Sequence, residues 1–261
     1  MRWLALASLF GCGRIHFAPE PSVSGDAMLS SVDAPISDAT LATGFVGAGP
    51  TVGWTTGVMT TSPVDLPAGV VPGDLLLLHV THQSGTVAAP AGWSTVVPEW
   101  GDGHCNVSGS AIYSRTAGAS EPPTVAVTCI TYCEAAISAF RWLDPVNPVD
   151  VVGPLGRTTA PDPCGTAITP QLQSVPPVTT TRPRDLVVVF YGDNDDQNIG
   201  GPSSQTLPAG VQQMYNAIGG QDLLAGVVGE VGAGTQSAQV ITVVNENTYG
   251  WTGVQLGLAL P

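Results

Sequence analysis

Apolar positions along this chain fall in short runs that glycine and proline interrupt. Residues 75–80 read LLLLHV and residues 186–191 read LVVVFY, and such continuous runs predict strands covered on both faces of a sheet. Residues 110–117, SAIYSRTA, and residues 238–245, AQVITVVN, alternate better, which predicts strands with one solvent-facing side. The pattern therefore predicts an all-β protein.

The apolar runs recur in a fixed order. The first half of the chain contains GDLLLLHV, APAGW, GSAIYSRTAGASEPP, TVAVTC and EAAISAFRWLD, and the second contains RDLVVVFY, LPAGV, LLAGVVGEVGAGTQ, AQVITVV and WTGVQLGLAL. We interpret this order as an internal duplication, with half-repeats at about residues 64–144 and 176–260. Because each half alone would leave an apolar face uncovered, we expect an antiparallel β-sandwich or jelly roll over residues 46–261, built from two similar halves that share one core.

Composition agrees with many short strands. Glycine (32) and proline (23) are abundant, and only 10% of the residues are charged, whereas long surface helices need glutamate, lysine and arginine. The net charge is −13, and all seven basic residues are arginines. Such a surface repels phosphate backbones, so no nucleic-acid partner is expected. The acidity fits solubility outside the cytoplasm, or calcium binding as a sharper alternative.

The N-terminus indicates export. Arg2 precedes an apolar run, Trp3–Phe10, that is too short to span a bilayer and is typical of a signal peptide. The segment LFGC, which ends at Cys12, resembles the bacterial lipobox, although Phe10 departs from the small residue usual there. We therefore expect a lipoprotein signal peptide over residues 1–11, lipidation of Cys12, and a flexible tether over residues 12–45, rich in Ser, Ala, Asp and Pro. Gly13, in place of Asp, favours the outer membrane; an unmodified Cys12 is the alternative.

Four further cysteines follow, at positions 105, 129, 133 and 164. In an exported domain they suggest two disulfides, for which three connectivities exist. A hairpin that folds SAIYSRTA onto TVAVTC would bring Cys105 near residues 129–133. We therefore expect Cys105 to pair with Cys129 or Cys133, and Cys164 to pair with the other. A zinc site would instead use His104, Cys105, Cys129 and Cys133, but the spacing and an oxidising compartment oppose it.

Two loops carry candidate ligand groups. The segment YGDNDDQN places Asp193, Asp195 and Asp196 just after a predicted central strand, and clustered carboxylates are ligands that calcium prefers; a solvated loop is the alternative. The segment PEWGDGHCN offers Trp100, Asp102 and His104 as a sugar-stacking platform, unless Trp100 is tucked under its own loop.

The remaining aromatic and histidine positions are assigned to the interior. We expect Trp93 and Trp142 to lie in the core or at its rim, and His79 to be a core histidine. The chain lacks a Gly-x-Ser-x-Gly elbow, a His-Glu-x-x-His motif and a glycine-rich phosphate loop before a helix.

The strings PAGW, YSRTAGASEP and AFRWLDPVNPVDV together resemble an uncharacterised β-sandwich module of bacterial secreted proteins, lipoproteins and phage-tail-like surface proteins. The resemblance covers about residues 46–261, and the lipobox with its Ala/Asp-rich tether is similar to lipoproteins of myxobacteria. It implies an exported β-sandwich and no catalytic residues.

From these observations we expect a non-catalytic, lipid-anchored lipoprotein of the cell envelope with a binding or structural role. The expected partners are the membrane, through the lipid, and surface polysaccharide or an envelope protein. No cofactor is required, and calcium is the one candidate ion. A glycan-active hydrolase on a jelly-roll scaffold is the alternative, although fold analogy alone supports it. An oligomeric adhesin or tail component is a third class.

Overall fold

The computed structural model describes residues 44–54, 59–83, 85–101, 108–158, 171–195, 204–218, 221–244 and 248–261. The chain divides into two compact units, Met1–Ser37 and Asp38–Pro261, and all the described residues belong to the second. These residues form antiparallel strands and no helix, which confirms the predicted all-β sandwich class. The described part of the chain accordingly offers no helix with the length and apolar character of a membrane span.

The first half of this unit contains a large and a small sheet. The large sheet has six strands in the order β1-β8-β4-β6-β5, with β2 also paired to β8. The small sheet pairs two strands, β3 with β7. The bounds of these strands are β1 Phe45–Ala48, β2 Val52–Trp54, β3 Thr60–Asp65, β4 Leu75–His82, β5 Ser94–Gly101, β6 Gly109–Thr116, β7 Thr124–Cys129 and β8 Cys133–Phe140.

The second half contains a large sheet of six strands in the order β10-β19-β13-β16-β15, with β9 also paired to β19. Two small sheets accompany it, β11-β18-β14 and β12-β17. The interpretation of the two halves as an internal duplication stays a prediction. The bounds are β9 Val149–Val152, β10 Gly156–Arg157, β11 Gln171–Val175, β12 Val178–Thr180, β13 Asp185–Asp195, β14 Ser204–Thr206, β15 Gln212–Ala217, β16 Asp222–Val231, β17 Gly234–Gln236, β18 Gln239–Val244 and β19 Thr248–Ala259.

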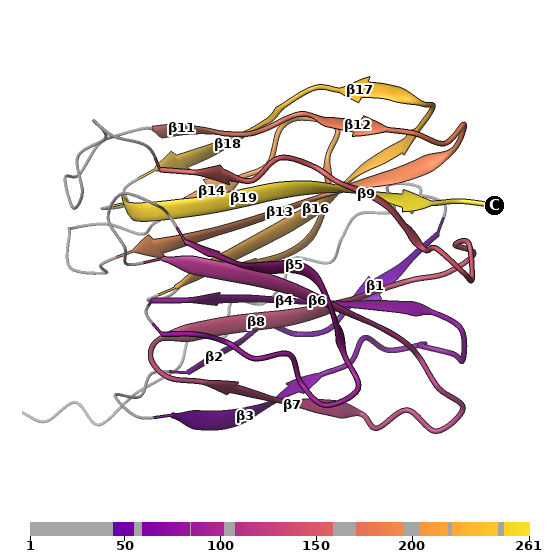
Figure 1. Cartoon of the computed structure of the whole chain (residues 1–261). Helices are drawn as coiled ribbons and strands as arrows, with labels where there is room; N and C mark the ends of the chain where they lie inside the picture. Colours follow the sequence, from indigo (N-terminus) through magenta and orange to yellow (C-terminus); the bar gives the residue numbers. More distant parts are fainter. Residues whose placement is uncertain are drawn as a thin grey trace, which may run out of the picture. The chain divides into compact units, whose positions relative to one another are not determined.

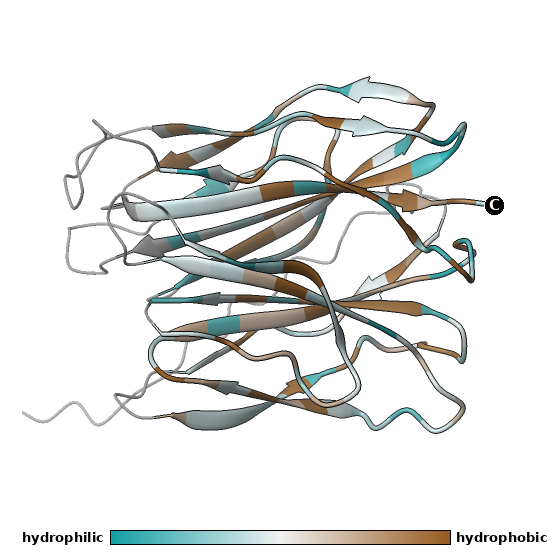
Figure 2. Ribbon diagram, in the orientation of Figure 1, coloured by the Kyte–Doolittle hydropathy of each residue, from teal (hydrophilic) through white to brown (hydrophobic). Residues whose placement is uncertain are grey.

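The large sheets face each other, and the small sheets lie outside them (Figure 1). A shared core fills the space between the large sheets: Leu75 and Leu77 of β4 pack there with Leu186 and Val188 of β13. Each half also has a core of its own on the other face of its large sheet. In Figure 2, apolar stretches accordingly lie on strands of the large sheets and also on strands of the small sheets that cover them.

This layering decides which strands are buried on both faces. All eight residues of β4 are buried, as the continuous run LLLLHV predicts. Strand β18 alternates between buried and more exposed positions, again as predicted. Strand β6 was predicted to have one solvent-facing side, and this prediction is wrong for most of the strand. Its first five residues are buried between the shared core and the core of the first half.

The PAG segments form the same tight turn in both halves. The amide of Trp93 donates to the carbonyl of Pro90 (3.0 Å), and the amide of Val211 donates to that of Pro208 (3.2 Å). The glycine inside each turn has a positive φ, 79° and 89° respectively. Such turns favour glycine at this position, because a positive φ costs glycine nothing and strains most other residues.

Candidate functional site

Trp100 is not an exposed platform. Its exposed fraction is 7%, it packs in the shared core, and its indole Nε1 donates to the carbonyl of Gly156 at 3.4 Å. The sugar-stacking interpretation of Trp100 is therefore wrong, since neither face of the ring is open to a ligand. Asp102 and His104, its predicted companions, lie outside the described residues.

The acidic segment after the central strand belongs largely to that strand. Strand β13 continues to Asp195, so Asp193 and Asp195 do not lie in a loop as predicted, and Asp196 is outside the described residues. Asp193 is buried, and its Oδ2 accepts a hydrogen bond from the hydroxyl of Tyr191 (2.7 Å). Across the strand pair lies Asp222, whose Oδ2 accepts from the Gln205 amide (2.8 Å). Calcium binding stays a prediction. That prediction assumed an exposed carboxylate on a loop, whereas Asp193 is buried in a strand.

The disulfide differs from the expected pairing. Cys129, the last residue of β7, is bonded to Cys133, the first residue of β8, with their Cα atoms 6.6 Å apart. The expectation that Cys105 takes one of these two and Cys164 the other is therefore wrong, and Cys105 and Cys164 lie outside the described residues. The bond links the small sheet of the first half to its large sheet. It also removes two thiolates from the zinc alternative.

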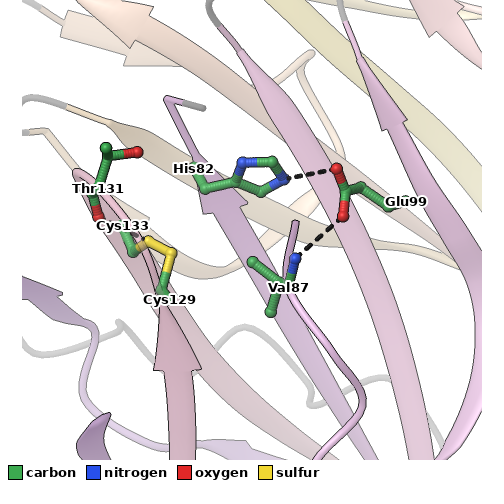
Figure 3. Close-up of a disulfide and its surroundings, with 6 residues drawn as sticks. All are labelled: His82, Val87, Glu99, Cys129, Thr131 and Cys133. Carbon is green, nitrogen blue, oxygen red and sulfur yellow. Dashed lines mark hydrogen bonds and ion pairs between the residues drawn. A yellow bond between two sulfur atoms is a disulfide. The ribbon is translucent and has the colours of Figure 1, made fainter. Parts of the chain in front are cut away.

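A histidine and a glutamate lie beside this disulfide (Figure 3). His82, opposite Cys133 on the neighbouring strand, directs its Nε2 toward Oε1 of Glu99 at 3.5 Å. The other oxygen of Glu99 accepts from the amide of Val87 at 2.9 Å. The hydroxyl of Tyr113 donates a hydrogen bond to the carbonyl of Val87. The pKa of Tyr113 is raised to about 12, mainly by burial and secondarily by the charge of Glu99. These contacts fix the chain after β4 against β5, which is a structural role.

Two buried carboxyl groups have raised pKa values. Burial raises the pKa of Glu134 to about 7, and Gly53 opposite it leaves the necessary room, since a Cβ there would lie 2.5 Å from Glu134 Oε2. Burial, and then the neighbouring Asp150, raise the pKa of Asp185 to about 6.

These two carboxyls lie at opposite ends of the large sheets. Glu134 is opposite Thr81, which contacts the Gly192 position, seven residues along β13 from Asp185. That is roughly 23 Å of strand, against the ~5–10 Å that separates the carboxyls of a glycosidase. Glu134 and Asp185 are therefore not such a pair.

The most exposed aromatic side chain in the described residues is Trp142, which follows β8. Its exposed fraction is 66%, so its assignment to the core or rim is wrong. Its φ is 58°, and among the described residues no other non-glycine residue has a positive φ. A left-handed backbone costs a bulky residue roughly 1–2 kcal/mol, and strain of this kind is characteristic of functional sites.

Backbone hydrogen bonds hold both sides of Trp142. The amide of Arg141 donates to the carbonyl of Gly44 (2.7 Å), and the amide of Asp144 donates to that of Ala259 (2.8 Å). Asp144 Oδ1 in turn accepts from the amides of Val146 (2.8 Å) and Asn147 (3.0 Å). We call residues 141–148 the Trp142 loop.

Ion pairs strengthen the same loop. Arg141 forms a two-pronged pair with the buried Asp74, in which both nitrogen–oxygen distances are 2.8 Å. Arg182 contacts Asp144 at 2.5 Å and Asp150 at 3.3 Å. The Arg182 hydrogen bond, followed by the amides of Asn147 and Val146, lowers the pKa of Asp144 to about 2. Asp144 is therefore ionised at any physiological pH, and the loop keeps its geometry.

Sequence reasoning missed this loop although a signal was present. The residues after Trp142 read LDPVNPVD, and closely spaced Pro, Asp and Asn indicate a connection at the surface. Comparisons with known protein families, curated proteins and solved structures gave no match.

Proposed function

We propose that this chain is a lipid-anchored protein of the bacterial cell envelope whose β-sandwich has a binding or structural role. Surface polysaccharide or another envelope protein is the partner. The Cys12 motif and the polar stretch after it support the anchor. The bonded pair Cys129–Cys133 supports export, because disulfides persist in oxidising compartments.

The observation that carries the binding role is the exposed, strained Trp142 on a hydrogen-bonded loop. A structural module has no need of a bulky residue at a positive φ, whereas a binding surface uses rigid aromatic side chains as anchors. Of the ligand groups predicted from the sequence, Trp100 and Asp193 are buried and bonded to the protein itself.

Lipidation is tested in a bacterial host that expresses the full chain and receives an alkyne-labelled palmitate. Labelling and partition into the detergent phase are expected for the wild type and are lost in Cys12→Ser. The Cys164→Ser variant is the matched control, since it also loses one thiol but keeps Cys12. An unlabelled wild-type chain in the aqueous phase would overturn the anchor.

A further inference from the structure

The Trp142 loop has a single large aromatic ring in polar surroundings. Trp142, Pro145 and Val146 are its exposed apolar residues, with exposed fractions of 66% for Trp142 and 79% for Val146, and Leu143 packs against the shared core. The same loop carries the exposed Asn147, the ionised Asp144 and Arg141, which is paired with Asp74, and Arg182 is bonded to it through Asp144. The exposed Trp142 thus stands on a loop that also carries groups able to donate and accept hydrogen bonds.

We propose that Trp142 is the platform on which a sugar ring of an envelope glycan stacks. A pyranose has an apolar C–H face that fits an indole ring, and its hydroxyls pair with charged and amide groups of the kind that this loop carries. The proposal rests on the binding role proposed above and names its surface and ligand class.

The size of the apolar surface favours a sugar over a protein partner. A stable protein interface buries about 800 Å² on each side around several large apolar anchors, and Trp142 is the one large anchor among the three exposed apolar residues of this loop. Anionic membrane lipids fit poorly as well, because the chain has a net charge of −13 and both arginines at the loop are paired with carboxylates.

The rigidity of the loop supports the same conclusion. Hydrogen bonds and ion pairs from residues 44, 74, 182 and 259 fix the backbone around Trp142. Binding then orders little of the protein, so a shallow surface with one ring retains useful affinity.

The test uses the full chain, purified in detergent from whichever cell fraction contains it. Immobilised lipopolysaccharide, peptidoglycan fragments and a panel of hexose and hexosamine oligosaccharides are the probes, and phospholipid vesicles without glycan are a parallel surface. We expect binding to at least one glycan probe, weakened about 30-fold in Trp142→Ala, as for the truncation of an aromatic hot spot. Trp142→Phe should retain most of the binding, because a phenyl ring still stacks.

Leu172→Ala is the matched control, since it truncates an exposed apolar side chain (70% exposed) on β11 and should bind like the wild type. Equal glycan binding by Trp142→Ala and the wild type would overturn the proposal, and so would the absence of binding to every glycan probe. Trp142-dependent binding to the vesicles alone would reassign the surface to lipid. Each of these results leaves palmitate labelling of Cys12 unaffected, so the anchor and the glycan surface fail separately.

Discussion

His79 offers a direct test of the shared core. It lies on β4, is fully buried, and packs its ring edge against Phe190 of β13, with ring centroids 5.2 Å apart. The hydroxyl of Tyr215, on β15, lies 3.3 Å from its Nδ1. Burial lowers the pKa of His79 from 6.5 to about 3, so the ring is neutral in the folded protein. We predict that acid destabilises the wild type more than a His79→Leu variant.

The sign follows from proton binding in the two states. Between pH 6.5 and pH 3 the unfolded chain binds a proton at His79 that the folded protein does not, so the free energy of unfolding falls as the pH falls. At 1.36 kcal/mol per pKa unit, the full shift amounts to about 5 kcal/mol once the pH is well below 3, and to about 2.5 kcal/mol between pH 6 and pH 4.

Other buried groups act with the opposite sign. The folded-state pKa values of Glu134 and Asp185, about 7 and about 6, lie above their ordinary values, so these groups stabilise the folded protein as the pH falls through that window. The pH dependence of the wild type alone therefore mixes both signs. The difference between the wild type and His79→Leu cancels the carboxyl contributions and isolates the histidine.

The assay is urea unfolding of the full chain at pH 6, 5 and 4, followed by tryptophan fluorescence. The free energy of unfolding of the wild type should fall by about 2.5 kcal/mol more than that of His79→Leu across this range. Phe190→Leu, which changes the same core without a titrating group, should follow the wild-type pH dependence. A constant difference between wild type and His79→Leu at the three pH values would refute the buried, neutral histidine.

Three further predictions concern backbone strain, the disulfide and glycine packing. Trp142→Gly should raise the free energy of unfolding by about 1 kcal/mol in a urea titration, because glycine accepts the positive φ; an unchanged or lower value contradicts the strain. The double variant Cys129→Ala, Cys133→Ala should have a free energy of unfolding about 2 kcal/mol lower than the wild type, as expected for a disulfide that closes a short loop. A reducing agent should lower the free energy of unfolding of the wild type by the same amount and leave that of the double variant unchanged. Gly109→Ala should lower the free energy of unfolding by about 1–3 kcal/mol, since its Cβ would lie 2.6 Å from the ring of His82. Gly101→Ala should leave it nearly unchanged, because the nearest atom there is 3.5 Å from the Cβ position. Equal losses in the two glycine variants would refute this packing.

The strands at the centre of the stack could be predicted because their sequences admit few alternatives. Residues 75–80 are apolar except for His79, and a short run of this length between turn residues favours a strand covered on both faces. Which side chains of β5 point into the core could not be predicted in the same way. Its pairing with β6 shifts register on both sides of Val97, so the alternation of inward and outward positions is lost and Trp100 turns into the core.

The disulfide likewise depends on which strands pair, and these strands are far apart in the sequence. A hairpin of β6 and β7 would have brought Cys105 near residues 129–133, but β6 pairs with β4 and β5, whereas β7 pairs with β3 in the small sheet. The chain then crosses from the small to the large sheet between Cys129 and Cys133, which brings these two together. Strand order across two layers, and not the spacing of cysteines, decides the pairing.

The position of Trp142 also depends on distant contacts. These contacts explain why a binding surface would arise at this place. The residues on either side of it are bonded to Gly44 and to Ala259, near the two ends of the described chain. Its positive φ thus occurs between one contact to the first half and one to the second, and a local sequence pattern does not express such distant contacts. The loop connects β8 of the first half to β9 of the second, and its residues belong to no strand of either large sheet. An exposed tryptophan can be kept there without cost to either sheet, whereas the interior positions of the strands are committed to the cores.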